Sequence, residues 1–294
     1  LTNKSQYTSE SLMANTIKNP IKINNFSEID EKYDSIICDI WGVIHNGQEL
    51  FNSSVECLLR YKEIGYPIIL VTNAPRPSDE IKGILQKMGL NKKCYDKIIT
   101  SGDLTQKILN KGDLGSSCYH IGPDRDLKVF DGVNVERVDF DCADFIFVTG
   151  LNDDETENDE SYLPLLELAK KRNLKLLCAN PDIWVQRGKD LIPCAGAISQ
   201  KYKSIGGETI NIGKPFAPIF NEAIKKIKFI SGKDINSTIV IGDGIDTDIK
   251  GANNYNLDSL LTLGGLFSGQ RKENIMESIN KKNVFPTYYI NELV

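Results

Sequence analysis

The feature that most constrains the fold is a regular alternation of short apolar runs with amphipathic segments. Apolar runs of four or five residues, such as 35–38 and 67–71, have the length of buried strands. Segments such as 54–64 repeat apolar residues at helical spacing and end at glycine. Strand and helix in alternation predict right-handed crossovers and an α/β fold with a doubly wound, mostly parallel sheet. Further strands are predicted at 98–100, 117–121, 145–149, 175–179, 239–242 and 260–263, and further helices at 78–88, 162–171, 218–229 and 247–254.

Size and composition describe a globular chain with room for two hydrophobic cores. The 294 residues are 40% apolar and 26% charged, and the formal net charge is −5. This length suits one large domain or two domains of moderate size. The negative charge offers nucleic acid no overall attraction, and no apolar run approaches the roughly 18–20 residues that cross a bilayer. We therefore expect neither nucleic acid nor a membrane as a partner.

The number and spacing of the cysteines indicate the redox conditions of the compartment in which the protein works. The seven cysteines are odd in number and form no C-x-x-C pair. Most of them sit beside apolar residues, which favours buried free thiols over a metal site or disulfides. The first twenty residues also lack the apolar stretch of a secretory signal. Together these features predict a cytoplasmic protein.

Polar residues that directly follow the apolar runs are the candidates for chemistry. In an open α/β sheet, ligands bind beyond the carboxyl ends of the strands, and these ends meet at one edge. We therefore expect the polar residues at these positions, together with a lysine that precedes a predicted helix, to lie close together. They are Asp39, Thr72, Asn73, Lys214, Asp243, Asp246 and Asp248.

This set of side chains suits phosphoryl transfer. A carboxylate such as Asp39 can attack phosphorus and hold the phosphoryl group, which divides a hard hydrolysis into two easier steps. Attack on a phosphate dianion requires that its charge be neutralised, so a lysine and a hard cation on oxygen ligands are expected. A strand-end aspartate taken alone is usually a turn or capping residue. The joint occurrence of the set favours catalysis.

Four segments resemble, in order, the four motifs of the haloacid dehalogenase superfamily of aspartate-nucleophile enzymes. Thr72 lies 33 positions after Asp39, too few for a cap domain, whereas Lys214 lies 142 positions after Thr72 and leaves room for one. This spacing is similar to class IIA, which includes the para-nitrophenyl phosphatase, pyridoxal phosphate phosphatase and N-acetylglucosamine-operon phosphatase types. The four segments are Asp39-Ile40-Trp41-Gly42-Val43, Val71-Thr72-Asn73-Ala74, Gly213-Lys214-Pro215 and Gly242-Asp243-Gly244-Ile245-Asp246-Thr247-Asp248.

The resemblance implies a domain organisation. The catalytic core would comprise residues 20–102 and 206–294, the α/β cap residues 103–205, and an N-terminal arm residues 1–19. The cap would close over the site and select the substrate. A homodimer is also implied, because caps of this class often pair.

Roles in the site follow from the resemblance residue by residue. Asp39 would be the nucleophile and a ligand of Mg²⁺, the implied cofactor. The backbone carbonyl of Trp41 and the carboxylates of Asp243 and Asp248 would complete the protein's ligands.

Substrate contacts are implied in the same way. Thr72, the backbone of Asn73, and Lys214 would hold the phosphoryl group, and Lys214 would also steady Asp39. The candidates for binding the rest of the substrate are Arg76, Asp182 and Arg187, with Arg125 and Trp184 as further possibilities in the cap.

The chain departs from the family at Trp41. Phosphatases of this superfamily usually carry an aspartate there, which protonates the leaving oxygen and later activates water. An indole cannot supply that proton at neutral pH, and general acid catalysis typically contributes about 10²–10⁴-fold. His45 is a candidate substitute, because its ordinary pKa near 6.5 suits proton transfer, although a structural turn histidine is the alternative reading. His120 is predicted to be structural or to face the substrate.

The sequence thus predicts a magnesium-dependent hydrolase of small phosphomonoesters, such as sugar phosphates, that works through an aspartyl-phosphate on Asp39. Its partner would be a small phosphorylated metabolite. The alternative is a catalytically weak relative that binds such a metabolite or a protein partner, because Trp41 argues against efficient chemistry. A dinucleotide-dependent enzyme is disfavoured, since no Gly-x-Gly-x-x-Gly is present.

Overall fold

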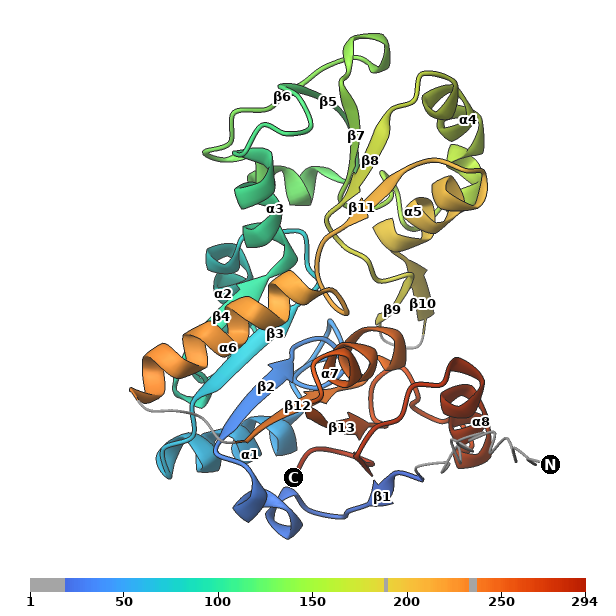
Figure 1. The fold of residues 1–294 in the computed structure, drawn as a ribbon. Helices are drawn as coiled ribbons and strands as arrows, with labels where there is room; N and C mark the ends of the chain where they lie inside the picture. The colour runs from blue at the N-terminus through green and yellow to red at the C-terminus, as the bar shows by residue number, and fades with distance from the viewer. Residues whose placement is uncertain (1–18, 188–189, 233–236) are drawn as a thin grey trace, which may run out of the picture.

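A computed structural model describes residues 19–187, 190–232 and 237–294. The chain forms a larger parallel sheet in the core and a smaller parallel sheet in a cap (Figure 1). The predicted α/β fold with a mostly parallel, doubly wound sheet is therefore confirmed. Within the described ranges, no helix combines the length and the apolar character needed to cross a bilayer.

The core sheet places β2 at its centre. All of its strands pair in parallel, and β2 has β3 on one side and β12 on the other. The chain therefore winds outward from β2 in both directions, and such a reversal is where open α/β sheets bind ligands. The order across the sheet is β1 (Ile21–Lys22), β14 (Tyr288–Ile290), β13 (Asp258–Thr262), β12 (Thr238–Gly242), β2 (Ser35–Asp39), β3 (Ile68–Thr72) and β4 (Lys97–Thr100).

Helices cover both faces of the core sheet. Alternate residues of β2 enter different hydrophobic clusters: Ile36 and Cys38 pack on the α1 and α2 side, and Ile37 packs on the α3 and α6 side. This two-sided burial explains why the core strands are continuous apolar runs. The helices are α1 (Asn52–Glu63), α2 (Ser78–Lys87), α3 (Ser101–Leu109) and α6 (Ala217–Ser231), with α7 (Lys250–Asn254) and α8 (Lys272–Lys282) beside β13.

The cap sheet is also parallel throughout. Its order is β11 (Thr209–Asn211), β8 (Lys175–Cys178), β7 (Phe145–Val148), β5 (Ser117–Ile121) and β6 (Glu136–Arg137). Helices α4 (Leu163–Lys171) and α5 (Ala195–Ser204) pack on one face. An antiparallel hairpin, β9 (Trp184–Arg187) and β10 (Asp190–Pro193), lies between the cap and the core (Figure 1).

The second boundary of the cap lies further along the chain than predicted. β11 pairs with β8 and belongs to the cap sheet, so the cap continues past the predicted end at residue 205 to Asn211. A three-residue strand carries too little periodicity to be recognised in the sequence. At the first boundary, α3 contributes Leu104 to a cluster that contains both Ile69 of the core and Phe145 of the cap. The predicted arm falls outside the described residues, apart from Asn19.

The loops that follow cap strands contact loops that follow core strands. The side chain of Asn73, after β3, donates a hydrogen bond to Asp182, which follows β8. The guanidinium of Arg76, also after β3, pairs with Asp126, which follows β5. Since all strands within each sheet are parallel, the carboxyl edges of the two sheets face each other.

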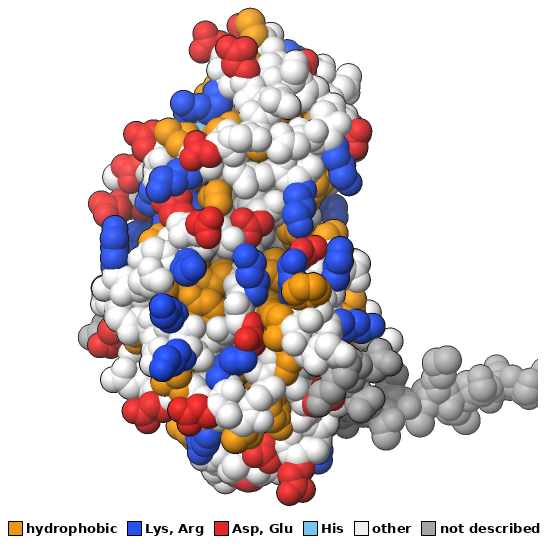
Figure 2. All heavy atoms as spheres, turned by 90° about the vertical axis from the view of Figure 1, so that its left-hand side faces the viewer, with side chains coloured by type: hydrophobic (Ala, Val, Ile, Leu, Met, Phe, Trp, Pro, Cys, Tyr) orange, Lys and Arg blue, Asp and Glu red, His pale blue; other side chains and the backbone are white. Residues whose placement is uncertain are grey.

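The structure also shows where the cysteines and the charged side chains lie. All seven cysteines lie within the described residues and are free; Cys142 is exposed and the other six are buried. On the face shown in Figure 2, basic and acidic side chains are interspersed, with a small hydrophobic area exposed between them.

Candidate active site

Three adjacent core strands deliver the predicted residues to one place. β2 ends in Asp39, β3 in Thr72, and Asp243 directly follows β12. Because these strands are neighbours in the sheet, their terminal side chains converge. All three are buried despite being polar.

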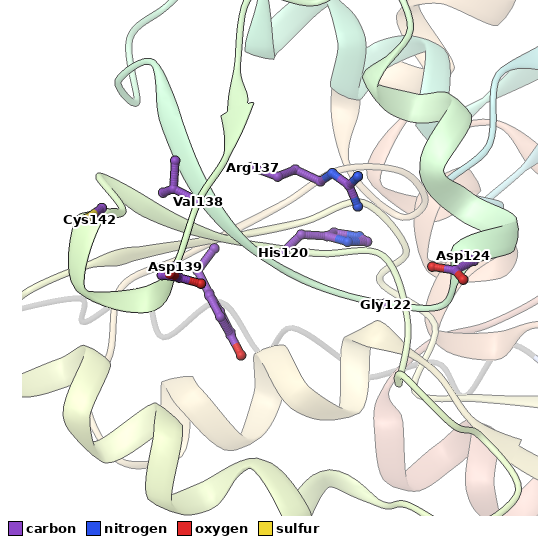
Figure 3. A pocket seen from close by; sticks show the side chains of 8 residues that line it. His120, Gly122, Asp124, Arg137, Val138, Asp139 and Cys142 are labelled. Atoms are coloured by element: carbon purple, nitrogen blue, oxygen red, sulfur yellow. The ribbon is translucent and has the colours of Figure 1, made fainter.

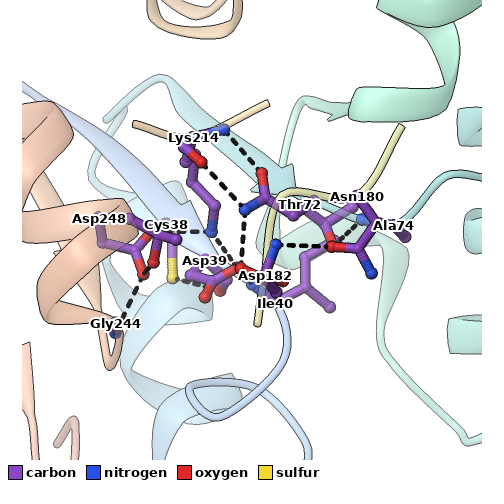
Figure 4. A network of polar contacts seen from close by, with 12 residues as sticks. Cys38, Asp39, Ile40, Thr72, Ala74, Asn180, Asp182, Lys214, Gly244 and Asp248 are labelled. Atoms are coloured by element: carbon purple, nitrogen blue, oxygen red, sulfur yellow. Dashed lines mark hydrogen bonds and ion pairs between the residues drawn. The ribbon is translucent and has the colours of Figure 1, made fainter. Parts of the chain in front are cut away.

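Lys214 joins this group from the segment between β11 and α6. Its Nζ lies 2.6 Å from Oδ1 of Asp39 and 2.8 Å from Oδ1 of Asp248 (Figure 4). Only 2% of Lys214 is exposed, so the ammonium is held by carboxylates and not by water. Burial alone would lower the pKa of Lys214, but the carboxylates of Asp248 and Asp39 outweigh it and raise the pKa. The lysine therefore stays charged beside the candidate nucleophile.

The carboxylates of Asp39 and Asp243 also have shifted pKa values, and for a carboxylate a raised pKa disfavours the charged form. Burial raises the pKa of Asp39 well above its ordinary value, the charge of Asp248 adds to this, and Lys214 opposes it. Burial also raises the pKa of Asp243 to about 7, again with Asp248 contributing. Three buried carboxylates thus share a single ammonium, and this imbalance favours a further positive charge at the site.

The same three carboxylates form a plausible cation site. One oxygen from each of Asp39, Asp243 and Asp248 lies within 4.8 Å of the others. Backbone amides hold two of them in place: Leu266 N–H donates to Oδ2 of Asp243 at 2.8 Å, and Gly244 N–H donates to Oδ2 of Asp248 at 3.2 Å. Buried oxygen ligands with excess negative charge suit a hard divalent cation such as Mg²⁺.

Two glycines permit this packing, and sequence reasoning did not single them out. A Cβ on Gly42 would lie 1.9 Å from Oδ2 of Asp243, and one on Gly265 would lie 2.0 Å from the same atom. Gly42 also has φ +85°, a conformation that side-chain-bearing residues rarely adopt. The glycine of the first motif was therefore the available signal for a close approach of the backbone to a carboxylate.

Trp41 occupies the turn that follows the nucleophile. Its indole packs edge-on against His45, with ring centroids 4.9 Å apart, and covers Gly47, where a Cβ would lie 2.6 Å from the indole. Gly42 N–H donates to the carbonyl of His45 and closes this turn. The predicted role of the Trp41 carbonyl as a metal ligand stays a prediction.

His45 is buried within the same turn. Its Nδ1 accepts a hydrogen bond from Gly47 N–H at 2.9 Å, so this nitrogen is already engaged as an acceptor within the turn. Burial, with a smaller effect of Arg76, lowers the pKa of His45 to about 4. Near neutral pH the imidazole is uncharged and has no acidic proton to transfer readily, so these features favour the structural reading.

The second-motif residues differ in what their side chains do. Thr72 presents a hydroxyl that accepts from Ala74 N–H at 3.2 Å and lies beside Asp39's strand end. The Asn73 amide instead contacts Lys214 and Asp182, so its side chain is engaged within the protein. A role in binding phosphate is left to its backbone.

The three predicted substrate contacts each have a protein partner. Asp182 accepts from Asn73, and Arg76 Nε lies 3.5 Å from Asp126. That Arg76 nitrogen is buried and has no hydrogen-bond partner within the part of the chain that the structure describes. Arg187 makes a bidentate contact with Asp154, at 3.1 and 2.7 Å. Neither a motif nor the spacing in the sequence predicted this pair. In the sequence, Asp154 stands in an acidic run, Asp153-Asp154-Glu155, and carries no motif that marks it as an arginine partner.

A cavity of about 680 Å³ lies between the hairpin and the core. The cap wall includes Asp182, Trp184 and Leu191, and the core wall includes Phe216 and Phe267. Residues 244–247, which lie between Asp243 and Asp248, also line this cavity, whereas Asp39, Lys214 and the two aspartates do not. Its mixed apolar and polar lining would accommodate the organic part of a small substrate.

A second hollow, of about 630 Å³, lies entirely in the cap. There, Arg137 and His120 extend side by side toward Asp124 (Figure 3). His120 contacts the Thr149 hydroxyl at 3.0 Å, and burial, with Arg137 contributing, lowers its pKa to about 4. No core residue lines this hollow, so His120 is not at the carboxylate cluster.

Comparisons with known proteins agree with this geometry. The family model of haloacid dehalogenase-like hydrolases matches residues 36–136, and a related HAD-hydrolase-like model matches residues 211–293. The crystal structure of a haloacid dehalogenase-like hydrolase from Brucella suis 1330 is 36% identical, covers 92% of this chain and 100% of its own, and superposes with a TM-score of 0.84.

Two more distant relatives have assigned activities. The acid sugar phosphatase of Staphylococcus aureus (strain USA300) is 23% identical over 265 residues, which is 90% of this chain and 96% of that protein. The glycerol phosphate phosphatase Rv1692 of Mycobacterium tuberculosis, solved in complex with magnesium, is 24% identical, covers 80% of this chain and 70% of its own, and has a TM-score of 0.61.

The order of the motifs, the cap between the second and third of them, and the 36% identical structure lead to one conclusion. The chain belongs to the haloacid dehalogenase-like hydrolases, as a class IIA phosphatase of that superfamily.

Proposed function

We propose that the protein hydrolyses small phosphomonoesters, of the sugar-phosphate type, with Mg²⁺ and through an aspartyl-phosphate on Asp39. The observation that carries the proposal is the buried contact of Lys214 with both Asp39 and Asp248, next to Asp243. A nucleophilic carboxylate, a fixed ammonium and additional oxygen ligands are the groups that phosphoryl transfer through a covalent intermediate needs.

The proposed cation fits the donors present. Asp39, Asp243 and Asp248 would hold it, since all are buried oxygen ligands with more negative charge than Lys214 balances. When bound, Mg²⁺ would neutralise phosphate charge and polarise the phosphoryl group.

The chain's own residues account for the covalent steps. The Asp39 carboxylate attacks phosphorus, and the bond from phosphorus to the ester oxygen breaks, which releases the alcohol or alkoxide. Water then attacks the phosphorus of the aspartyl-phosphate, the bond to Asp39 breaks, and phosphate leaves. Lys214 would offset negative charge in both steps, and the Thr72 hydroxyl would donate to a phosphoryl oxygen.

Proton transfer to the leaving oxygen is the weak step. Trp41 stands where the family carries an acid, and His45 is buried with a pKa lowered to about 4, first by burial. We therefore expect turnover to depend steeply on the leaving group, with good leaving groups favoured.

Two features support the proposed substrate class. The acid sugar phosphatase of Staphylococcus aureus aligns with 90% of this chain. The cavity beside the carboxylate cluster offers amide, hydroxyl and lysine side chains along with aromatic ones, a combination that suits a polyol phosphate. We place the reaction in the cytoplasm, in keeping with seven free cysteines.

The second candidate is a weakly catalytic protein that binds a phosphorylated metabolite or a partner. Trp41 is the observation that favours it, because the indole packs into its turn and offers no acid. The intact set of Asp39, Thr72, Lys214 and Asp243 favours catalysis over this reading. A homodimer through the caps stays a prediction.

The test is turnover of para-nitrophenyl phosphate with magnesium, for the parent and for Asp39→Asn. This ester has a good leaving group and tolerates a missing general acid. Activity that requires both magnesium and Asp39, together with a phosphorylated protein trapped from the parent alone, is the expected result. A parent no more active than the variant would refute hydrolysis and support the binding protein, which a thermal shift with magnesium and beryllium fluoride would then reveal.

A further inference from the structure

Lys214 lies on the second connection between cap and core. β11, the last strand of the cap sheet, ends at Asn211, and α6 of the core begins at Ala217. The lysine that contacts Asp39 therefore sits in a five-residue linker, residues 212–216, and any rotation of the cap would pull on its backbone. Ser101, at the start of α3, holds the near end of this linker through a 2.6 Å hydrogen bond to the Ile212 carbonyl.

The Asn73 amide holds the middle of the linker. Its Oδ1 accepts from Lys214 N–H at 2.7 Å, and its Nδ2 donates to the Lys214 carbonyl at 3.3 Å. A Cβ on Gly213 would lie 2.4 Å from the same Oδ1, so the linker backbone passes directly against the amide. The position of the Lys214 backbone thus depends on the orientation of one side-chain amide.

The third contact of that amide reaches the cap. Nδ2 of Asn73 also donates to Oδ1 of Asp182 at 2.8 Å. Asp182 is fixed to the cap, because its carbonyl accepts from Gly196 N–H at 3.0 Å in the first turn of α5. A Cβ on Gly196 would lie 2.4 Å from this carbonyl, so helix and loop are in close contact. The Asp182 carboxylate therefore moves with the cap.

We infer that Asp182 is a positioning residue that couples the position of the cap to Lys214 through the amide of Asn73. With the cap in place, Asp182 fixes the orientation of the amide, the amide fixes the Lys214 backbone, and Nζ reaches Asp39. When the cap moves away, the amide loses its cap partner and the lysine loses its alignment. The site would thus be fully assembled only under a closed cap.

This inference rests on the proposed function for its kinetic consequence, and it replaces substrate binding as the role of Asp182. A displacement of about 1 Å in a catalytic group can cost up to about 100-fold in rate. A variant at Asp182 leaves the side chains of Asp39, Lys214 and the carboxylate cluster in place. The charge of Asp182 also acts on Lys214, and an asparagine variant removes that charge while it keeps an oxygen that can accept from Asn73.

The experiment compares Asp182→Ala with Asp182→Asn on para-nitrophenyl phosphate. Asparagine keeps an oxygen that accepts from Asn73 but cannot donate a carboxylic proton at neutral pH. We expect Asp182→Ala to lower kcat about 10–100-fold with little change in KM, and Asp182→Asn to restore most of that loss. Should the alanine variant fail to fold, Asp182→Ser serves as the second loss-of-contact variant.

A measurement without turnover accompanies the kinetics. Hydrogen exchange of the peptide spanning 211–216 includes the Lys214 N–H, the amide that donates to Asn73. Exchange there should become about tenfold faster in Asp182→Ala and return toward the parent rate in Asp182→Asn, with strand 238–242 unchanged.

The matched control is Asp144→Ala. Asp144 is another cap carboxylate held by hydrogen bonds, from the Ser116 and Ser117 amides at 2.9 and 3.0 Å, and it makes them within the cap. Its removal should leave both kcat and the exchange of 211–216 at the parent values.

Other outcomes would overturn the inference. A raised KM with unchanged kcat would make Asp182 a substrate contact. An asparagine variant as impaired as alanine, with losses that grow for poorer leaving groups, would make it a proton donor. Unchanged exchange at 211–216 in Asp182→Ala would refute the coupling itself. An inactive parent whose exchange pattern still follows this order would refute the proposed function and leave the coupling in place.

Discussion

The carboxyl edges of the core sheet and the cap sheet face each other but hold their charges differently. On the core edge, Lys214 and Asp248 are 2% and 1% exposed, and Nζ lies 2.8 Å from Oδ1. On the cap edge, the side chains of Arg125 and Arg187 are 51% and 36% exposed, and both contact Asp154. Although both sheets are parallel, the charged cluster at the core edge is buried, whereas the charged cluster at the cap edge is partly exposed to solvent.

This difference separates two tasks. Buried charges interact strongly and cannot relax into water, which suits stabilisation of a reacting phosphoryl group. Half-exposed arginines retain free N–H donors toward solvent and can exchange a water for a substrate oxygen at little cost. We therefore expect changes on the core edge to act on kcat and changes on the cap edge to act on KM or stability.

The largest effect is expected on the core edge, from Lys214→Ala. Without the ammonium, Asp39 and Asp248 would repel each other and phosphate charge would be unbalanced, so kcat should fall about 10²–10³-fold. Lys203→Ala, which removes a lysine from the wall of the cavity, is the matched control and should change kcat by less than about threefold. The measurement is the kcat of both variants and the parent on one phosphate ester. Similar losses of kcat in both variants would contradict the expected difference between the two edges.

A smaller effect, on stability, is expected where the edges meet at Asp126. Burial raises the pKa of Asp126 to about 6; Arg76, Arg125 and the Thr149 hydroxyl oppose this, and Glu80 adds to it. Because the folded state holds the proton more tightly than an unfolded aspartate with a pKa of 3.8, folding takes up a proton and stability falls as pH rises from about 4 to 6.

Asp126→Asn should remove this dependence. Relative to the parent, its free energy of unfolding should improve by about 2 kcal/mol between pH 4 and pH 7. Urea unfolding at both pH values measures it. Parallel stability curves for the two proteins would mean that Asp126 is ionised as easily in the folded chain as in the unfolded one.

A change of about tenfold is expected on the cap edge, from Asp154→Ala. Loss of this carboxylate releases Arg125 and Arg187 from their fixed positions, so KM should rise about tenfold while kcat stays within about threefold. Asp153→Ala is the control, because the Asp153 carboxylate accepts from Glu155 N–H and the Thr156 hydroxyl, and among the described residues Arg125 and Arg187 pair with Asp154. A kcat effect larger than the KM effect would place these arginines in the chemistry.

The smallest effect is expected from His45→Asn. Since burial lowers the pKa of His45 to about 4, the imidazole is neutral in the parent and its removal should leave the pH profile of kcat in place. The ratio of turnover between a good and a poor leaving group should also stay within about twofold of the parent. A selective loss with poor leaving groups would restore His45 as the substitute acid.

Much of the core could be predicted because its signals are local. β2, β3 and β12 are apolar runs buried on both faces, and each ends in a polar residue of the site. Asp39, Thr72 and Asp243 could be expected to converge because the ends of parallel strands share an edge. Helices α3, α5 and α8 were not predicted from the sequence, because short segments with small or polar residues, such as 195–204, show weak helical periodicity.

Side-chain partnerships could not be predicted in the same way. The sequence treats Asn73 as a neighbour of Thr72, whereas the structure connects its amide to residues 109 and 141 positions away. Likewise, Asp154 belongs to an acidic run in the sequence but pairs with two arginines in the fold. Such contacts depend on how the cap docks on the core, which no local pattern encodes.

The sequence by itself determined the parallel α/β architecture, the four motifs and the place of the cap in the chain, because each rests on periodicity, residue type or spacing. Only the tertiary structure decided that Lys214 sits on the linker between the domains, that β11 belongs to the cap, and that His45 is buried with a committed Nδ1. The physical reason is that burial and hydrogen-bond partners are properties of packing between distant segments, and they set the charge and the position of each group.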